Sequence, residues 1–179
     1  SSNSIFGGTY YLLREVEENL NINVSYVEGS DIKSYEKAIQ PNTKAIFCET
    51  IGNPKLDVPN IKKLSEVANK AGIPLVLDGT VSTPYLLDAK ALGAHIVWHS
   101  VTKWLGGTGT TIGGVIVDLN NYKWKESKKP SIKTLYKTLG NLAFLARCKK
   151  LRSNRGCCLA PFNAFLLSNG SETLALRMD

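Results

Sequence analysis

Short apolar runs alternate with segments of helical spacing through the middle of the chain. Residues 44–48, 74–77 and 95–98 are predicted to be buried strands, because each is a brief apolar run bounded by polar or turn residues. Residues 59–71 have apolar positions three or four apart and end at Gly72, which predicts a helix. This alternation is typical of βαβ units. It predicts an α/β protein with a mostly parallel open sheet and helices on both faces.

A fourth apolar run follows at residues 114–117. The Gly- and Thr-rich stretch before it has no helical period, so it supplies no crossover helix, and this strand is predicted to run antiparallel to the third. The remaining elements expected are a strand at 24–27 and helices at 10–20, 31–39, 85–92, 131–151 and 160–176.

Composition limits the classes of partner. Of the 179 residues, 43% are hydrophobic and 21% charged, and no apolar run approaches the ~18 residues of a membrane helix. The net charge of +7 is concentrated in residues 120–155, which hold 11 of the 22 basic residues and one acid. Leucines at helical spacing among these lysines favour a charged surface helix over a nucleic-acid patch. Neither a membrane nor a nucleic acid is therefore expected as a partner, and with no leader at residues 1–4 the location is expected to be cytoplasmic.

Polar residues gather where the three parallel strands end. The clusters at 49–54, 78–80 and 100–107 each follow one strand. Each could be an ordinary loop, since Asp, Asn, Ser and Gly are common loop residues. Ligands of open α/β sheets bind at the carboxyl ends of the strands, however, so the three clusters are expected to form one pocket.

The side chains of these clusters favour one kind of chemistry. Asp78 ends an apolar strand, Lys103 follows the third strand, and Ser100 and Thr102 lie beside Lys103 in the sequence. Such a site can hold an anion and a cationic ring, and its amine can act as a nucleophile. A lysine for a Schiff base together with an aspartate for a pyridinium nitrogen describes a site for pyridoxal 5'-phosphate.

Other kinds of site do not match the sequence. Lys103 precedes its glycines, so it is not in a Walker A loop, and Ile112 stands where a dinucleotide fingerprint needs its last glycine. His95 and His99 would lie about 13 Å apart along one strand, too far to share a metal ion, so no metal site is expected. Ser100 lacks the flanking glycines of a serine-hydrolase elbow.

Five motifs, in order, resemble those of the Cys/Met-metabolism family of pyridoxal-phosphate enzymes. They are Phe-Gly-Gly-Thr at 6–9, Glu-Thr-Ile-Gly-Asn-Pro at 49–54, Leu-Asp-Gly-Thr at 77–80, Ser-Val-Thr-Lys-Trp-Leu-Gly-Gly at 100–107 and Pro-Phe-Asn-Ala-Phe-Leu-Leu at 161–167. The first, second and last are most similar to the O-acetylhomoserine sulfhydrylase branch. The resemblance extends over nearly the whole chain and implies the large cofactor-binding domain of fold type I.

The resemblance implies that six residues bind the cofactor, namely Phe6, Asn53, Asp78, Ser100, Thr102 and Lys103. Lys103 would be the catalytic residue, forming the Schiff base and moving the α and β protons of the substrate. Asp78 would pair with the pyridine nitrogen and Asn53 with the ring 3-oxygen. Phe6 would stack on the ring, and the two hydroxyls would bind the phosphate.

The chain departs from the family pattern at four positions. Phe6 replaces the usual tyrosine, Gly79 an asparagine, His95 an acid, and Thr108 a frequent histidine. The lysine and the aspartate are both kept.

The activity implied is replacement of the acetoxy group of O-acetylhomoserine by sulfide, giving homocysteine in methionine and cysteine metabolism. The protein would act on a small amino acid as a homo-oligomer, a dimer of dimers. The alternatives are a methionine γ-lyase, a cystathionine γ-synthase or lyase, or a non-catalytic fragment that keeps the fold.

The family's subunits are much longer than this chain. Residues 1–155 are therefore expected to be the central part of the cofactor-binding domain, and residues 156–179 a helical segment leading into a missing C-terminal domain. The 179 residues by themselves are expected to be inactive.

Overall fold

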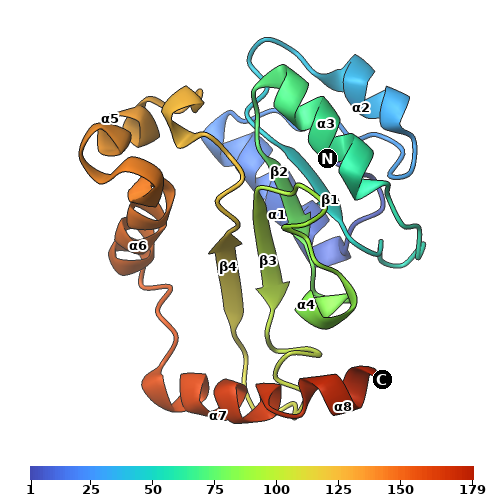
Figure 1. Ribbon diagram of the computed structural model, residues 1–179, viewed down its shortest axis with the longest axis vertical. Helices are drawn as coiled ribbons and strands as arrows, with labels where there is room; N and C mark the ends of the chain where they lie inside the picture. Colours follow the sequence, from blue (N-terminus) through green and yellow to red (C-terminus); the bar gives the residue numbers. More distant parts are fainter.

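The computed structural model describes all 179 residues and contains a four-stranded sheet in the order β1-β2-β3-β4 (Figure 1). The strands β1 (Ile46–Glu49), β2 (Leu75–Asp78) and β3 (Ile96–Ser100) run parallel. The last strand, β4 (Gly114–Asp118), pairs antiparallel with β3. The prediction of a mostly parallel sheet with an antiparallel fourth strand is confirmed.

Eight α-helices surround this sheet. They are α1 (Gly7–Leu20), α2 (Ile32–Ala38), α3 (Ile61–Ala71), α4 (Thr83–Leu86), α5 (Pro130–Leu139), α6 (Ala143–Arg155), α7 (Pro161–Ser171) and α8 (Leu174–Met178). None of them is both long and apolar enough to cross a membrane.

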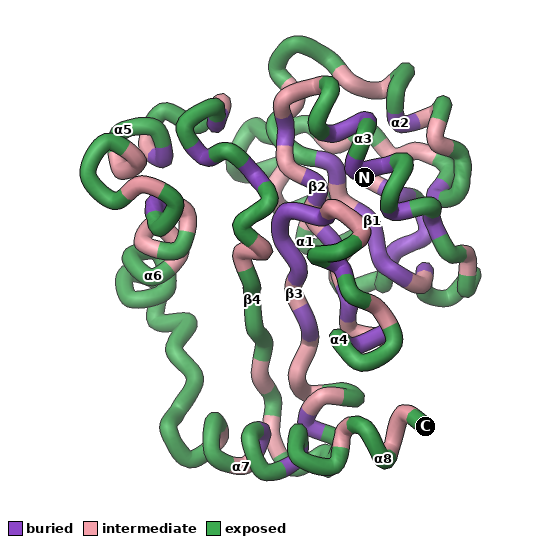
Figure 2. Tube along the Cα trace, viewed as in Figure 1, coloured by how far each residue is buried: buried purple, intermediate pink, exposed green.

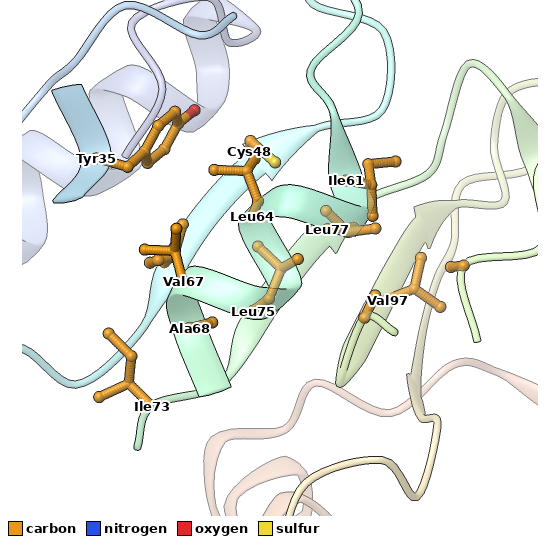
Figure 3. Close-up of a cluster of buried hydrophobic side chains, with 13 residues drawn as sticks. Tyr35, Cys48, Ile61, Leu64, Val67, Ala68, Ile73, Leu75, Leu77 and Val97 are labelled. Atoms are coloured by element: carbon orange, nitrogen blue, oxygen red, sulfur yellow. The ribbon is translucent and has the colours of Figure 1, made fainter. Parts of the chain in front are cut away.

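One face of the sheet packs against α3. The helix begins after Asn60, whose side chain accepts a hydrogen bond from the Lys63 amide at 3.0 Å, and it ends at Gly72 in the left-handed conformation. Leu64 and Ala68 on its apolar face are fully buried against Leu75 and Leu77 of β2 (Figure 3). Removing each leucine from water stabilises the fold by about 1.5–3 kcal/mol.

On the opposite face, α5, α6 and the 3₁₀ turn Trp124–Glu126 form a second buried cluster with the sheet. Because side chains alternate along a strand, Val76 and Ile96 point to this face and contact the second buried cluster. Trp124 anchors it: the indole stacks on Phe144 at 4.4 Å between ring centroids and donates to the Asp118 carboxylate at 2.7 Å. Helices therefore pack on both faces, as the sequence predicts, while β4 stays largely exposed.

Three predicted elements before the C-terminal helices differ in the structure. The helix expected at 85–92 is only the single turn α4, because Leu87 is extended and the Asp88 side chain accepts from the Ala91 amide, which competes with helical bonding. The helix expected at 131–151 is divided into α5 and α6 at Gly140, whose φ is +54°. The strand expected at 24–27 is a single bridge in which Val27 pairs with Ser2.

The carboxyl end of β3 points toward α7 and α8, which lie across this edge of the sheet (Figure 1). Buried residues concentrate in β1, β2, β3 and α3, whereas β4, α6, α7 and α8 are mostly exposed (Figure 2). The helix predicted at 160–176, with a break or cap at 169–171, is this pair of helices. The predicted place of the break is wrong, because α7 continues to Ser171 and the break lies at Glu172 and Thr173. The polar edge of the sheet is thus bordered by helices from the end of the chain.

We predict that His95→Leu lowers the free energy of unfolding by about 1–3 kcal/mol. The buried imidazole accepts a hydrogen bond from the Leu75 amide at 2.7 Å and contacts the Asn69 side-chain oxygen at 3.1 Å. Burial lowers the pKa of His95 to about 4, so the ring is neutral and its Nδ1 can accept. Leucine would leave the Leu75 amide buried without a partner. Urea denaturation measures the change, and wild-type stability would contradict this account.

Candidate active site

A cavity of about 910 Å³ opens at the carboxyl ends of β2 and β3. Four of the six predicted site residues line it: Phe6, Asp78, Ser100 and Thr102. They come from the start of α1, the end of β2 and the end of β3. The prediction that separate polar clusters meet at this edge therefore holds for the second and third clusters.

Phe6 is placed by the residue that ends β1. Its amide donates a hydrogen bond at 2.7 Å to Glu49 Oε1, so the start of α1 is fixed to the edge of the sheet. Its ring folds back over Gly8, where an added Cβ would lie only 2.6 Å from Phe6 Cε1. Gly8 thus makes room for the aromatic ring, which remains 53% exposed at the cavity.

A chain of hydrogen bonds connects the ends of β2 and β3. Asp78 Oδ1 accepts from the Thr80 amide at 2.9 Å, and Thr80 Oγ1 accepts from the Ser100 amide at 2.8 Å. Thr80 therefore holds the aspartate and the serine at the same edge. The spacing Asp-x-Thr, which permits this turn, is the signal by which the sequence indicates such a role.

The turn after β3 carries Thr102 and Lys103. The hydroxyl of Thr102 donates to the Gly113 carbonyl at 3.2 Å and accepts from the Gly113 amide at 3.0 Å. The Lys103 amide donates to the Ser100 carbonyl at 3.1 Å, and the Lys103 carbonyl accepts from Gly107 at 2.8 Å. Lys103 itself is exposed and does not line the cavity, but the residue before it does.

Asn53 also lies outside the cavity lining. It is exposed in the loop after β1, next to the buried Gly52, whose amide donates to the Asp57 carbonyl at 2.9 Å. A Cβ at Gly52 would lie 2.2 Å from Asp57 Oδ1, so this loop needs glycine. The structure anchors the loop beside the site without placing the Asn53 side chain in it.

Sequence reasoning missed the wall that α6 contributes. Leu145, Cys148, Lys149 and Arg152 line the cavity from this helix. They are three, one and three residues apart, so they lie on one face of the helix. This spacing is the sequence signal from which a shared face could have been predicted. Lys149 and Arg152 make this wall positively charged.

Two ionisable groups at this edge have shifted pKa values. Burial, with the Asp78 carboxylate as a further cause, raises the pKa of Glu49 to about 7, although the Phe6 amide acts in the opposite direction. Burial also lowers the pKa of His99, whose Nδ1 has no hydrogen-bond partner. His99 occupies the space beside Gly79, where an added Cβ would lie 2.5 Å from His99 Cε1. The glycine that departs from the family pattern is thus matched to this ring.

The groups around the cavity suit pyridoxal phosphate. Phe6 offers an aromatic face, Asp78 a carboxylate and Ser100 a hydroxyl, while the amine of Lys103 stands on the adjoining turn. A carboxylate stabilises a protonated pyridine, hydroxyls bind phosphate, and an amine bonds to a carbonyl carbon. No group of three or more potential metal ligands is present.

Comparisons with known proteins support pyridoxal phosphate as the cofactor of the family. The model of the family described as Cys/Met metabolism PLP-dependent enzyme matches residues 1–179. The O-acetyl-L-homoserine sulfhydrylase of Leptospira meyeri is 41% identical over 100% of the chain and 45% of its own length.

Two solved structures are also similar. The O-acetylhomoserine sulfhydrylase of Wolinella succinogenes has a TM-score of 0.89 and 41% identity, over 98% of this chain and 49% of that one. A putative O-acetylhomoserine (thiol)-lyase of Campylobacter jejuni, which contains pyridoxyl-lysine-5'-monophosphate, has a TM-score of 0.83 and 36% identity, over 98% of this chain and 46% of that one. The chain therefore spans less than half the length of these relatives.

We predict that Glu49→Gln stabilises the cofactor-free protein at high pH and has less effect at low pH. The pKa of Glu49 in the folded protein, about 7, lies above its ordinary value of 4.5, so the folded state binds the proton more tightly. The stability that this proton contributes is complete below about pH 4.5 and is lost as the pH rises through 7. Glutamine stays neutral and can still accept from Phe6.

The free-energy difference between the variant and the wild type should therefore move in favour of the variant by as much as about 3 kcal/mol between pH 4.5 and 7.5. Denaturant titrations of both proteins at several pH values measure it. Taking the difference removes the contributions of His95 and His99, which are common to both. A difference that does not vary with pH would rule out the raised pKa.

Proposed function

The chain belongs to the Cys/Met-metabolism family of pyridoxal-phosphate-dependent enzymes, and from this premise we propose that it is part of an O-acetylhomoserine sulfhydrylase. The proposed reaction replaces the acetoxy group of O-acetylhomoserine by sulfide and gives homocysteine. The observation that carries this proposal is the convergence of Phe6, Asp78, Ser100 and Thr102 on one cavity, with Lys103 on the adjoining turn. Sulfhydrylases are also the relatives that share 41% identity with the chain.

We propose the same six residues as the cofactor site. Bound pyridoxal phosphate withdraws electrons from the α and β carbons of an amino acid, which lets a γ substituent leave. Asp78 pairs with the ring nitrogen: the Thr80 amide holds Oδ1, which leaves Oδ2 to accept from the ring. A carboxylate in this partly buried position is stabilised by a cationic partner.

The other five residues have distinct tasks in this proposal. Phe6 packs its ring against the cofactor, and it has no phenol, so it does not donate a proton. Ser100 binds the phosphate through its hydroxyl. Thr102 also binds the phosphate when its hydroxyl rotates and donates to the phosphate in place of the Gly113 carbonyl. Asn53 contacts the ring 3-oxygen from the loop after β1. Lys103 would hold the cofactor covalently before substrate binds, and its amine, once the substrate amine has replaced it on the cofactor, would move protons between the substrate's α and β carbons.

The extent of the chain is part of the same proposal. Residues 1–155 form the central part of a cofactor-binding domain, and residues 156–179 lead into a further domain. The chain's coverage of 45% of its Leptospira relative supports this division. We further propose a homo-oligomer, because large apolar side chains such as Tyr11 and Phe162 are about 70% exposed in the chain alone.

We predict that the full-length protein, supplied with pyridoxal phosphate, converts O-acetylhomoserine to homocysteine only when sulfide is added. Thiol chromatography detects homocysteine, and a dehydrogenase-coupled assay detects 2-oxobutyrate. Formation of 2-oxobutyrate without sulfide would show a γ-lyase instead, and no product under either condition would show a protein that keeps the fold without the activity.

The matched variants for this assay are Asp78→Asn and Asp31→Asn. Asp78→Asn keeps the shape of the side chain but removes the charge, so turnover should fall about 100-fold or more, corresponding to roughly 3 kcal/mol. Asp31 is the N-cap of α2 and does not line the cavity. The Asp31→Asn variant should therefore retain the activity of the wild type.

A further inference from the structure

Arg177 on α8 reaches the turn that carries Lys103. Its Nη1 donates to the Trp104 carbonyl at 2.5 Å, and its Nη2 lies 3.4 Å from the Leu105 carbonyl. These two carbonyls belong to the residues directly after Lys103. The same guanidinium also bonds to its own end of the chain. Its Nη2 donates to the Gly170 carbonyl at 2.8 Å and its Nε to Thr173 Oγ1 at 2.9 Å.

Glycines shape the turn to fit this contact. Gly107 has a φ of +67°, and an added Cβ there would lie 2.3 Å from Arg177 Cζ. The backbone of Gly170 in α7 packs directly against the backbone of the turn. An added Cβ at Gly170 would lie 1.8 Å from the Gly106 carbonyl oxygen. Substitution at either position would force the turn and the helix apart. The glycines therefore serve the packing of α7 and α8 against the turn.

The internal hydrogen bonds of the turn leave two carbonyls for Arg177. Gly106 donates to the Val101 carbonyl at 2.9 Å and Gly107 to the Lys103 carbonyl at 2.8 Å. The carbonyls of Trp104 and Leu105 are the ones that receive the guanidinium. A planar fork of donors suits two neighbouring carbonyls, which the single ammonium of a lysine cannot bind in the same way.

The helix that carries Arg177 is also attached to the segment after Asp78. The Tyr85 hydroxyl on α4 donates to the Asp179 side chain, next to the end of α8. The end of the chain thus contacts both the turn with Lys103 and the short helix that follows Asp78.

We propose that Arg177 is a positioning residue for Lys103. This inference rests on the proposed function, in which the Lys103 amine holds the cofactor and moves protons. Arg177 holds the turn in one conformation, and so the amine is presented at one place beside the cavity. Proton transfer depends steeply on this placement, because a displacement of about 1 Å can cost 100-fold in rate.

The test uses the full-length protein saturated with pyridoxal phosphate and compares Arg177→Met, Arg177→Lys and the control Arg155→Met. Arg155 lies exposed in the last turn of α6 and does not line the cavity. For Arg177→Met we expect kcat to fall about 10- to 100-fold with little change in KM, because substrate binding groups are unaffected.

A readout besides turnover separates positioning from general stability. The absorbance of the bound cofactor is titrated against pH without substrate. This titration reports the pKa of the nitrogen atom that joins Lys103 to the cofactor. We expect this pKa to shift in Arg177→Met and to return part of the way in Arg177→Lys, which can still donate to one carbonyl. Arg155→Met should match the wild type in both measurements.

A lowered melting temperature with an unchanged kcat and an unchanged absorbance titration would overturn the inference and show a purely structural arginine. If Arg177→Met fails to fold, Arg177→Lys alone decides, because it keeps the charge and the length of the side chain. A wild-type protein with no borohydride-reducible bond at Lys103 would refute the proposed function and this inference together. A wild type that forms the bond, with Arg177 variants identical to it, would refute this inference alone.

Discussion

The parallel pairing of β1, β2 and β3 is the constraint on which the candidate site depends. In this register Glu49 lies beside Asp78, and Asp78 beside Trp98, so the residues after each strand emerge at one edge. The register is maintained by α3, whose buried face would lose its contacts if a strand slipped by one residue. The core under α3 therefore determines where the reactive groups lie.

Two carboxylates at neighbouring strand ends would repel each other if both were charged. Charge on Glu49 is disfavoured, because burial raises the pKa of Glu49 to about 7. The Asp78 side chain accepts from the Thr80 amide. Glu49 accepts from the Phe6 amide and holds the start of α1, whereas Asp78 lines the cavity. The same division of roles between paired acids is common in active sites.

Much of this arrangement is predictable from local sequence. The apolar strands, the antiparallel β4 and the polar residues at the strand ends follow from periodicity and from the rule that ligands bind at carboxyl edges. The helix expected at 85–92 failed because the Asp88 side chain offers the backbone a competing turn. The spacing of the α6 residues shows that they share one helical face, but not that this face borders the cavity. The contacts of Arg177 with the turn after Lys103 join residues far apart in the chain, and no local pattern contains them.

The central claim is that this edge of the sheet holds pyridoxal phosphate on Lys103, and borohydride reduction tests it most directly. The full-length protein with its cofactor is reduced, digested and mapped by mass spectrometry, with Lys103→Ala as the matched control. The account predicts one pyridoxyl group on Lys103, which is absent from the variant. A pyridoxyl group on another lysine, such as Lys149 on the opposite wall of the cavity, would contradict it.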